Sequence, residues 1–423
     1  MTTECKQTSI DKALKEWEVV KLRDVILDIA DGGTPSTKIE EYFNGDIPWV
    51  NIKDIKKDIY DTRRHLSELG LRNSSAKLWN EGTLIFSFGA SIGKVGIARV
   101  KLCTKQGIAG IVLDLDKVDN EFLYYVLLKE AEKIKQIGKS MGSTIREVRP
   151  SKLKRLVVFP LPPLLEQRKI AQILSTVDLA IGKVDEVIAK TERLKKGLMQ
   201  ELLTKGIGHK EFKDTKIGKI PKEWQVVRLK DVAELESGGT PSRKKPEYWN
   251  GNIPWFRSGE LNDDIIYNTE EKITELGLRN SSAKVFPRGT LLMALYGRGT
   301  VSKTAILGID ATTNQAIGAI TPIDSSFDAR FMQYYLIFSR NKLLNQLVYP
   351  SSDVGRTNIY LGSLKLFKIA LSSLQEQQKI AEILSAVDKK LELEKREKAK
   401  LEKIKRALMD LLLTGKVRVK VTD

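Results

Sequence analysis

Apolar residues recur every three or four positions over two long stretches of the chain. In the first stretch, 164–203, these positions are Ile170, Leu174, Val177, Ile181, Val184 and Ile188. The second stretch begins at Ile380, is interrupted by Glu394 and Lys398, and resumes at Leu401. Such spacing puts the apolar side chains on one face of an α-helix. It predicts two helices of roughly 40 residues, each about 60 Å long at about 1.5 Å per residue.

Each predicted helix has a single apolar stripe, and that stripe needs a partner. The length of the helices and the heptad spacing favour a coiled coil in which the two stripes cover each other. The alternative is that each helix is an ordinary amphipathic helix packed on its own globular domain.

Shorter apolar patterns precede each long helix. Residues 17–22 and 224–229 alternate between apolar and polar side chains, as half-buried strands do. Further runs predict buried strands at 83–88 and 108–113, a helix at 121–137 and an extended segment at 153–161. The predicted fold class is therefore mixed α/β, with globular domains and two long helices.

The sequence also repeats itself with an offset close to 207. The ten residues Glu-Leu-Gly-Leu-Arg-Asn-Ser-Ser-Ala-Lys at 68–77 recur letter for letter at 275–284. A period of this length is far too long for a solenoid unit, so it indicates two copies of a domain-plus-helix module. We predict globular domains at 1–160 and 206–370 and helical regions at 161–205 and 371–423. Two like modules can form a pseudo-twofold object, which suits duplex DNA.

Composition favours a globular protein with a polyanionic partner. The chain has 423 residues, 41% hydrophobic and 30% charged, and a net charge of +17. That charge points to nucleic acid or an anionic membrane surface. No apolar stretch approaches the ~18 residues of a membrane span. We therefore expect a soluble cytoplasmic protein without a membrane segment.

The residues that usually carry catalysis are scarce. His65 and His209 are the only histidines, and Cys5 and Cys103 occupy non-equivalent places in the repeat. Residues 89–95 resemble a phosphate-binding loop but have one residue too few between the glycines and Val95 where Ser or Thr would bind magnesium. We expect no catalytic site, no metal site and no cofactor in this chain.

A basic duplicated protein without a catalytic centre is expected to act by binding. Contacts to phosphate carry no sequence information, so the two copies should share them. The shared turn Gly-Gly-Thr-Pro-Ser and the ten-residue identity are either framework or phosphate contacts. The candidates in and beside these segments are Thr34, Ser36, Arg72, Thr240, Ser242, Arg243 and Arg279.

Residues that read bases should differ between the copies if the two half-sites differ. The differences concentrate in a few loops. The candidates in these loops are Asn51, Lys53, Ser91, Lys94, Ser143 and Arg146 in the first copy and Arg257, Ser258, Arg298, Thr300, Lys303 and Arg356 in the second. Asn51 and Arg257 are aligned, and Asn pairs with adenine and Arg with guanine. Our hypothesis is that this position reads a base in both copies; the alternative is a surface residue or a phosphate contact.

The duplicated series resembles the DNA specificity subunit of type I restriction-modification systems over essentially the whole chain. The resemblance rests on Trp-Glu-Val-Val-Lys-Leu at 17–22 with its copy at Trp224, the Gly-Gly-Thr-Pro-Ser turns, both Ile-Pro-Trp segments, and Leu-Pro-Pro-Leu-Leu-Glu-Gln at 161–167. Gln106 and Gln315 match a polar spot that precedes an apolar strand in the family. Leu-Ser-Ser-Leu at 371–374 departs from the family pattern.

The resemblance implies two target-recognition domains, 1–160 and 206–370, each reading one part of a split DNA site. It also implies that the two helical regions pair antiparallel and fix the spacing. The subunit itself would not be catalytic. Its partners would be double-stranded DNA, methyltransferase (modification) subunits and restriction/translocase subunits, and S-adenosylmethionine, ATP and Mg would belong to those subunits. The alternatives are a stand-alone DNA-binding regulator or scaffold and an enzyme with a noncanonical site.

Overall fold

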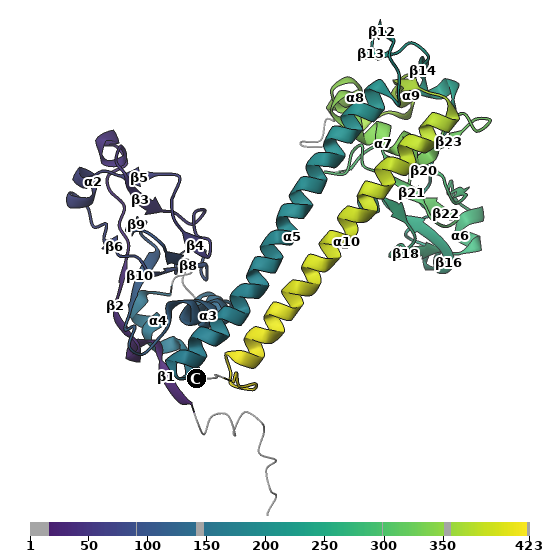
Figure 1. Cartoon of the computed structure of the whole chain (residues 1–423). Coiled ribbons are helices and arrows are strands. Elements are labelled where there is room, and N and C mark those ends of the chain that lie inside the picture. The colour runs from purple at the N-terminus through teal and green to yellow at the C-terminus, as the bar shows by residue number, and fades with distance from the viewer. Residues whose placement is uncertain (1–16, 90, 141–147, 298, 351–356, 421–423) are drawn as a thin grey trace, which may run out of the picture. The chain divides into compact units, whose positions relative to one another are not determined.

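The computed structural model describes residues 17–89, 91–140, 148–297, 299–350 and 357–420 (Figure 1). The chain forms two compact units. The first combines the residues up to 185 with those from 396 onward, and the second is the continuous segment 186–395. Each unit thus holds one globular part and one half of each long helix.

The first unit is built on a five-stranded sheet in the order β2-β10-β7-β8-β4. Its strands are β2 (Ile26–Asp31), β4 (Asp58–Ile59), β7 (Leu84–Ser87), β8 (Val95–Ala98) and β10 (Ile108–Leu113). The helix α3 (Asn120–Ser140) shares a buried core with this sheet. The strands predicted at 83–88 and 108–113 and the helix predicted at 121–137 are therefore confirmed.

A second, four-stranded sheet in this unit has the order β5-β3-β9-β6. Its strands are β3 (Ile47–Val50), β5 (His65–Leu66), β6 (Leu78–Trp79) and β9 (Leu102–Thr104). The central strands β3 and β9 are parallel, with Trp49 opposite Cys103 and Val50 opposite Thr104. Their carboxyl ends therefore lie at one edge of the sheet.

The extended segment predicted at 153–161 is wrong in its first part. Residues Pro150–Leu156 form the helix α4, and only β11 (Val158–Leu161) is extended, paired with β1 (Glu18–Lys21). Pro150 stands at the start of α4, where its fixed φ suits a helix and its missing N–H is not needed. Only Leu153 of α4 is fully buried, so the short helix carried little apolar signal.

The second unit repeats this architecture. Its larger sheet, β15-β23-β20-β21-β17, consists of β15 (Ala233–Ser237), β17 (Ile265–Ile266), β20 (Leu291–Ala294), β21 (Thr304–Leu307) and β23 (Ile317–Pro322). Its smaller sheet consists of β16 (Trp249–Phe256), β18 (Glu271–Ile273), β19 (Val285–Phe286) and β22 (Ala311–Thr313). Here β16 and β22 are the parallel pair. Residues 225–228 form β14, which pairs with β26 (Lys368–Leu371) as β1 pairs with β11.

Some elements occur in the second unit alone among the described residues. A hairpin of β12 (Phe212–Thr215) and β13 (Gly218–Pro221) follows the first long helix. The place of α3 is taken by α7 (Ala329–Phe338) and α8 (Arg340–Leu347), followed by β24 (Val348–Pro350) and β25 (Thr357–Ile359). The helix α9 (Leu361–Lys365) then precedes β26 as α4 precedes β11.

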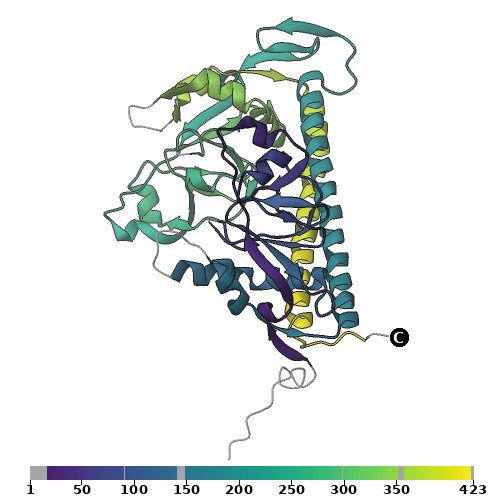
Figure 2. The ribbon, with the colours of Figure 1, turned by 90° about the vertical axis from the view of Figure 1, so that its left-hand side faces the viewer.

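The long helices are α5 (Leu164–Lys205) and α10 (Leu374–Leu412), and within each unit they run antiparallel (Figures 1 and 2). In the first unit, Asp178 pairs with Lys405 at 2.5 Å and Asp185 with Lys398 at 2.7 Å. A step of seven residues up α5 is thus matched by a step of seven down α10. In the second unit, Lys195 pairs with Asp388 at 2.5 Å.

Both readings of the apolar stripes hold, in different parts of the helices. The coiled-coil prediction is confirmed by the pairing of α5 with α10. The ends of the helices also pack on the globular parts: Ile170 and Leu174 join the core of the first unit, and Ile380 and Leu384 join that of the second. The interruption at Glu394 is a polar pair inside the seam, because Thr191 Oγ1 donates to Glu394 Oε1 at 3.2 Å.

Candidate nucleic-acid interface

In the first unit, the carboxyl ends of β3 and β9 place Asn51 beside Lys105 and Gln106. The Lys105 amide donates to Val50 O at 3.0 Å, which continues the strand pairing past the end of β9. The Asn51 side chain donates through Nδ2 to Trp49 O at 3.2 Å, and the Asn51 backbone N–H donates to Asp54 Oδ2 at 2.9 Å. Asn51 is therefore held at the edge by one hydrogen bond from its side chain and one from its backbone.

The shared Gly-Gly-Thr-Pro-Ser turn packs against the same edge. Gly33 N donates to Thr104 O at 2.9 Å, and the Trp49 indole donates to Gly33 O at 3.0 Å. A Cβ on Gly32 would lie 2.2 Å from Thr104 O, and one on Gly33 would lie 2.2 Å from Ala76 N. The glycines are therefore needed for close backbone approach. Thr34 is half-buried and Ser36 is exposed beside them.

Two predicted lysines of the first unit lie at this edge. Lys94, from the loop after β7, donates through Nζ to Ile52 O at 2.8 Å. Lys53 lines a hollow of about 330 Å³ together with Asn51. Ser91 is exposed in the same loop as Lys94, and its carbonyl accepts a hydrogen bond from Ser87 Oγ at 2.6 Å.

In the second unit, the ends of β16 and β22 bring Arg257 beside Asn314 and Gln315. The Asn314 amide donates to Phe256 O at 2.9 Å. Gln315 Oε1 accepts a short hydrogen bond from Thr240 Oγ1, which joins the turn to the strand end. Ser258 and Thr300 both lie next to Gly297, where a Cβ would be 2.4 Å from Thr300 Oγ1 and 3.2 Å from Ser258 Oγ.

Arg257 and Arg243 are held in a network of carboxylates. Arg257 pairs with Glu270, and its Nε lies 3.4 Å from Glu271 Oε2 and 3.8 Å from Glu260 Oε2. Arg243 donates to Glu271, and its guanidinium lies 3.7 Å from the centre of the Trp249 ring. The hydrogen bond from Arg243 lowers the pKa of Glu271. The Arg257 guanidinium is thus oriented but largely neutralised.

The ten-residue identity forms the same short helix in both copies, α2 (Glu68–Arg72) and α6 (Glu275–Arg279). Ser67 and Thr274 cap these helices by accepting from Gly70 N and Gly277 N, both at 3.1 Å. A Cβ on Gly70 would meet Tyr42 O at 2.4 Å. This packing accounts for much of the identity as framework.

The remaining predicted residues are not joined to the strand ends in this way. Arg72 and Arg279 are exposed at the last positions of α2 and α6. Ser242 accepts a hydrogen bond from the Trp249 indole through its carbonyl, and Lys303 is half-buried. Ser143, Arg146, Arg298 and Arg356 lie outside the described residues.

Sequence reasoning missed Arg63, Arg64 and the lysine at 105, which line the hollow beside Asn51. The signal was present in the alignment of the copies. At the positions of Arg63 and Arg64, the second copy has Glu270 and Glu271. A reversal of charge at aligned positions of a repeat indicates that the two copies make different interactions there.

Both histidines are bound to carboxylates. His65 Nε2 lies 2.7 Å from Asp61 Oδ1, and His209 Nε2 lies 2.9 Å from Glu376 Oε1. Over the described ranges, no group of three or more His, Cys, Asp or Glu side chains could hold a metal ion. In the same ranges, no helix is both long and apolar enough to cross a membrane.

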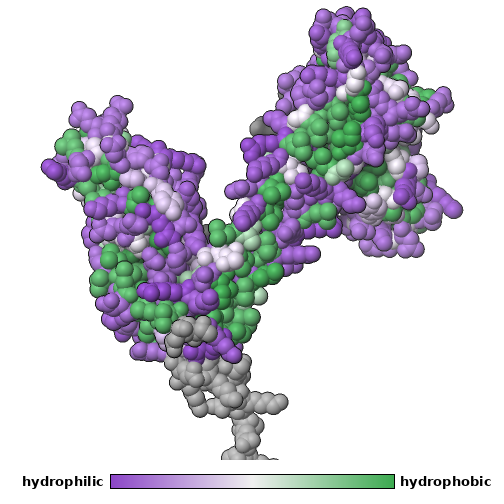
Figure 3. Space-filling view, in the orientation of Figure 1, coloured by the Kyte–Doolittle hydropathy of each residue, from purple (hydrophilic) through white to green (hydrophobic). Residues whose placement is uncertain are grey.

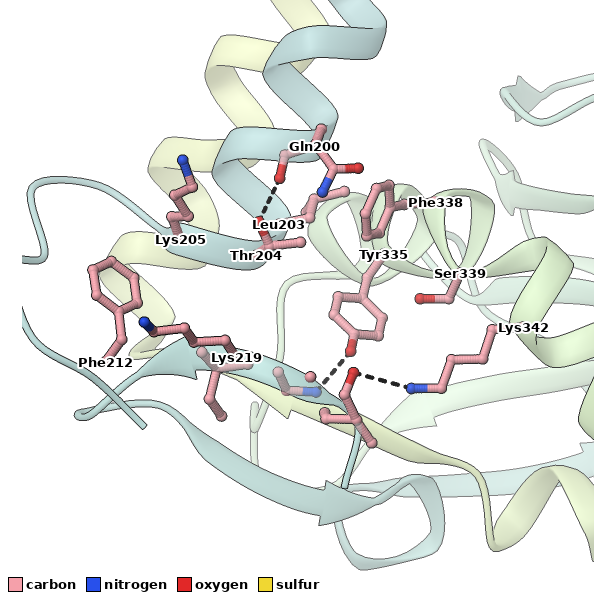
Figure 4. Close-up of a pocket in the computed structure, with 14 residues that line it drawn as sticks. Gln200, Leu203, Thr204, Lys205, Phe212, Lys219, Tyr335, Phe338, Ser339 and Lys342 are labelled. Carbon is pink, nitrogen blue, oxygen red and sulfur yellow. Dashed lines mark hydrogen bonds between the residues drawn. The ribbon is translucent and has the colours of Figure 1, made fainter. Parts of the chain in front are cut away.

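A larger hollow, of about 610 Å³, lies in the second unit away from the strand ends (Figure 4). It is lined by the end of α5, the β12–β13 hairpin and the α7–α8 region. Tyr335 Oη accepts from Ala370 N at 2.9 Å, and Lys342 Nζ donates to Ile217 O at 3.2 Å. Burial lowers the pKa of Lys342. None of the predicted DNA-binding residues lines this hollow.

Comparison with known families accounts for the duplication of the chain. The model of the type I restriction modification DNA specificity domain matches the chain twice, at 14–190 and 221–403. The chain belongs to the family of type I restriction-modification specificity subunits. Its family membership also confirms that it is the specificity component of such a system and not a catalytic one.

Some relatives are similar to this chain over its whole length, and others over one part of it. The chain is 30% identical over 430 residues to the type I restriction enzyme MjaIX specificity subunit of Methanocaldococcus jannaschii, covering 99% of this chain and 97% of that one. It is 30% identical over 171 residues to the EcoR124I/EcoR124II specificity subunit of Escherichia coli, covering 39% of this chain and 41% of that one.

Solved structures support the fold. The chain resembles the S subunit of a type I restriction-modification system from M. genitalium with a TM-score of 0.59 at 17% identity, covering 96% of this chain and 97% of that one. It resembles a chain from a structural study of complex assembly and conformational transition in the type I R-M system with a TM-score of 0.56 at 20% identity, covering 95% and 98%. The predicted fold class, two tandem domains with two long paired helices, is confirmed.

Proposed function

We propose that each unit of this specificity subunit reads one half of a bipartite double-stranded DNA site through the edge where its parallel strands end. The observation that carries the proposal is the repetition of that edge. The same strand pair presents Asn51, Lys105 and Gln106 in one copy and Arg257, Asn314 and Gln315 in the other. The topology is shared and the side chains differ, as expected of two readers of different base sequences.

The amide and guanidinium groups at these edges suit base recognition. Asn and Gln can pair with adenine, and Arg with guanine, each through two hydrogen bonds. The lysines and arginines around them suit phosphate, whose contribution to affinity is large and independent of sequence. The net charge of +17 supports binding of this kind.

The long helices are proposed to dock modification subunits, and through them restriction/translocase subunits. Large apolar side chains remain exposed on α5 and α10, including Leu179 at 67% and Leu194 at 53% on α5 and Leu393 at 56% on α10. Figure 3 shows apolar surface along α5. Exposed apolar surface of this kind is typical of protein–protein contact. S-adenosylmethionine, ATP and Mg are assigned to these partner subunits and none to this chain.

The test is co-purification followed by mapping of methylation. We expect the tagged chain, expressed in a host that carries its neighbouring genes, to purify with a methyltransferase. We expect methylated adenines mapped across the genome to define a motif of two half-sites with a fixed spacer. A chain that purifies alone and binds one continuous DNA site would instead support the stand-alone regulator.

A further inference from the structure

The hollow beside Asn51 in the first unit is lined by an excess of positive charge. Lys53, Arg63, Arg64 and Lys105 all contribute to its wall, against one carboxylate, Asp54. Asp54 Oδ2 accepts a hydrogen bond from the Asn51 backbone N–H, and Asp54 Oδ1 lies 3.8 Å from Arg63 Nε. One acid that is already engaged cannot balance four cations.

These four cations form few ion pairs within the fold. The Arg63 side chain is 71% exposed, and Lys53 and Lys105 are also exposed. The Arg64 guanidinium lies 4.4 Å from the centre of the Phe43 ring, a stacking contact that orients the group and leaves its charge unpaired. Within the described ranges, no carboxylate forms an ion pair with Lys53, Arg64 or Lys105.

The second copy has two acidic and two neutral residues at the same place. Gly259 aligns with Lys53, Glu270 with Arg63, Glu271 with Arg64 and Asn314 with Lys105. Glu270 forms an ion pair with Arg257, and Glu271 forms one with Arg243. The aligned residues of the first copy, Asn51 and Thr37, are uncharged. The network that neutralises the second copy therefore has no equivalent in the first.

A nearby ion pair has its two charges exchanged between the copies, and it serves as a comparison. Lys57 pairs with Glu121 at 3.1 Å in the first unit, and the aligned Asp264 pairs with Arg330 at 3.0 Å in the second. Both charges have changed sign together, and the ion pair is kept. At Arg63 and Arg64 the sign is reversed, but the partner positions, Asn51 and Thr37, are uncharged and not acidic, so the fold does not account for the excess.

We propose that this hollow holds a phosphate of the DNA backbone, and that the second unit makes no phosphate contact at the equivalent place. The inference rests on the proposed function and adds that the two units anchor DNA unequally. Arginine side chains bind phosphate through two hydrogen bonds, and lysines add charge. A volume of about 330 Å³ is roughly ten times the share of a water molecule in the liquid, about 30 Å³, so a phosphodiester fits.

The test compares the salt dependence of DNA binding between variants of the full chain co-expressed with its modification subunits. The probe is a fluorescent duplex of random sequence, with anisotropy measured at increasing potassium chloride. The variant Arg63→Gln/Lys105→Gln changes two exposed side chains. We expect the slope of log affinity against log salt to become less negative by about 1 to 2, because each lost phosphate contact removes about 0.9. The matched control, Arg23→Gln, changes an exposed arginine on η1 (Leu22–Asp24) and should leave the slope unchanged.

A second pair of variants separates charge from packing at Arg64. Arg64→Lys should keep most of the slope, and Arg64→Gln should make it less negative by about 0.9, while both variants stay folded. An unchanged slope in Arg63→Gln/Lys105→Gln, with wild-type binding intact, would overturn the phosphate site alone. A wild-type complex that does not bind the duplex even at low salt would instead overturn the proposed function.

Discussion

The indole of Trp224 donates a hydrogen bond through Nε1 to Glu376 Oε2 at 3.0 Å, across 152 positions of the sequence. The same relationship joins Trp17 to Glu166 in the first unit, at 3.3 Å. Each glutamate lies in the first turn of a long helix. The pair ties the start of a globular part to the start of the helix that follows it.

The second oxygen of each glutamate binds the segment that follows the other long helix. Glu376 Oε1 accepts from Ile207 N at 2.8 Å, after α5. Glu166 Oε1 accepts from Arg418 Nε at 2.9 Å and Val419 N at 3.2 Å, after α10. One carboxylate thus joins three parts of its unit.

Replacement of Glu166 is expected to destabilise the first unit. Its side chain is only 5% exposed, and Glu166→Ala would leave the Trp17 indole and the Val419 amide without their acceptor. An unsatisfied buried donor costs about 1–3 kcal/mol, so we expect a loss of at least about 2 kcal/mol in urea unfolding. The control Glu201→Ala removes a surface pair with Lys205 on α5 and should cost less than about 1 kcal/mol. Equal losses for the two variants would contradict this role.

The polar pair inside the coiled-coil seam is expected to cost stability. Glu394 is 9% exposed, and its Oε2 is buried without a hydrogen-bond partner. Replacing a buried polar pair by apolar residues is often neutral or stabilising by about 1–4 kcal/mol. Thr191→Val/Glu394→Leu should therefore raise the free energy of unfolding of the second unit. Thermal unfolding measures it, and a lower melting temperature would show that the pair stabilises the helices.

Arg257 is expected to read a base in the second half-site. Loss of a bidentate contact is worth about 1–3 kcal/mol of discrimination. In Arg257→Asn, mapped methylation should show relaxed or altered preference at one position of that half-site, with the first half-site unchanged. Because Glu270 and Glu271 pair with Arg257, Glu270→Gln serves as a control for the loss of one ion pair. A uniform loss of affinity across all sequences would make Arg257 a phosphate contact.

The length of the paired helices is expected to set the spacer of the DNA site. Seven residues inserted near Lys190 in α5, with seven more near Glu394 in α10, keep the heptad seam in register. They add about 10 Å at 1.5 Å per residue. The preferred spacer should then lengthen by about three base pairs, at roughly 34 Å per turn of DNA. Mapped methylation with the original spacer, from a folded variant, would exclude this role.

Most of the architecture could be predicted because its signals are local or repeated. The heptad seam predicted α5 and α10, and apolar runs predicted β7 and β10. The repeat predicted two equivalent units without any knowledge of their topology. The helix α4 was missed because its seven residues bury only one side chain completely.

The composition of the candidate site could be predicted only in part. Asn51 and Lys105 meet because β3 and β9 are parallel, and no local pattern signals a pairing between segments so far apart in sequence. Arg63 and Arg64 come from a third segment, before β5. Their charge was visible in the sequence, but the absence of neutralising partners needed the spatial arrangement of both copies.

The two units do not become complete at the same time as the chain is made. The core of the second unit draws on residues between Met199 and Leu384, a continuous stretch. The core of the first unit joins residues up to Leu174 with Met409, Leu412 and Leu413. On the ribosome, the second unit can therefore bury its core while the first still waits for the end of α10. The unit whose synthesis begins first is thus the last to have its whole core available.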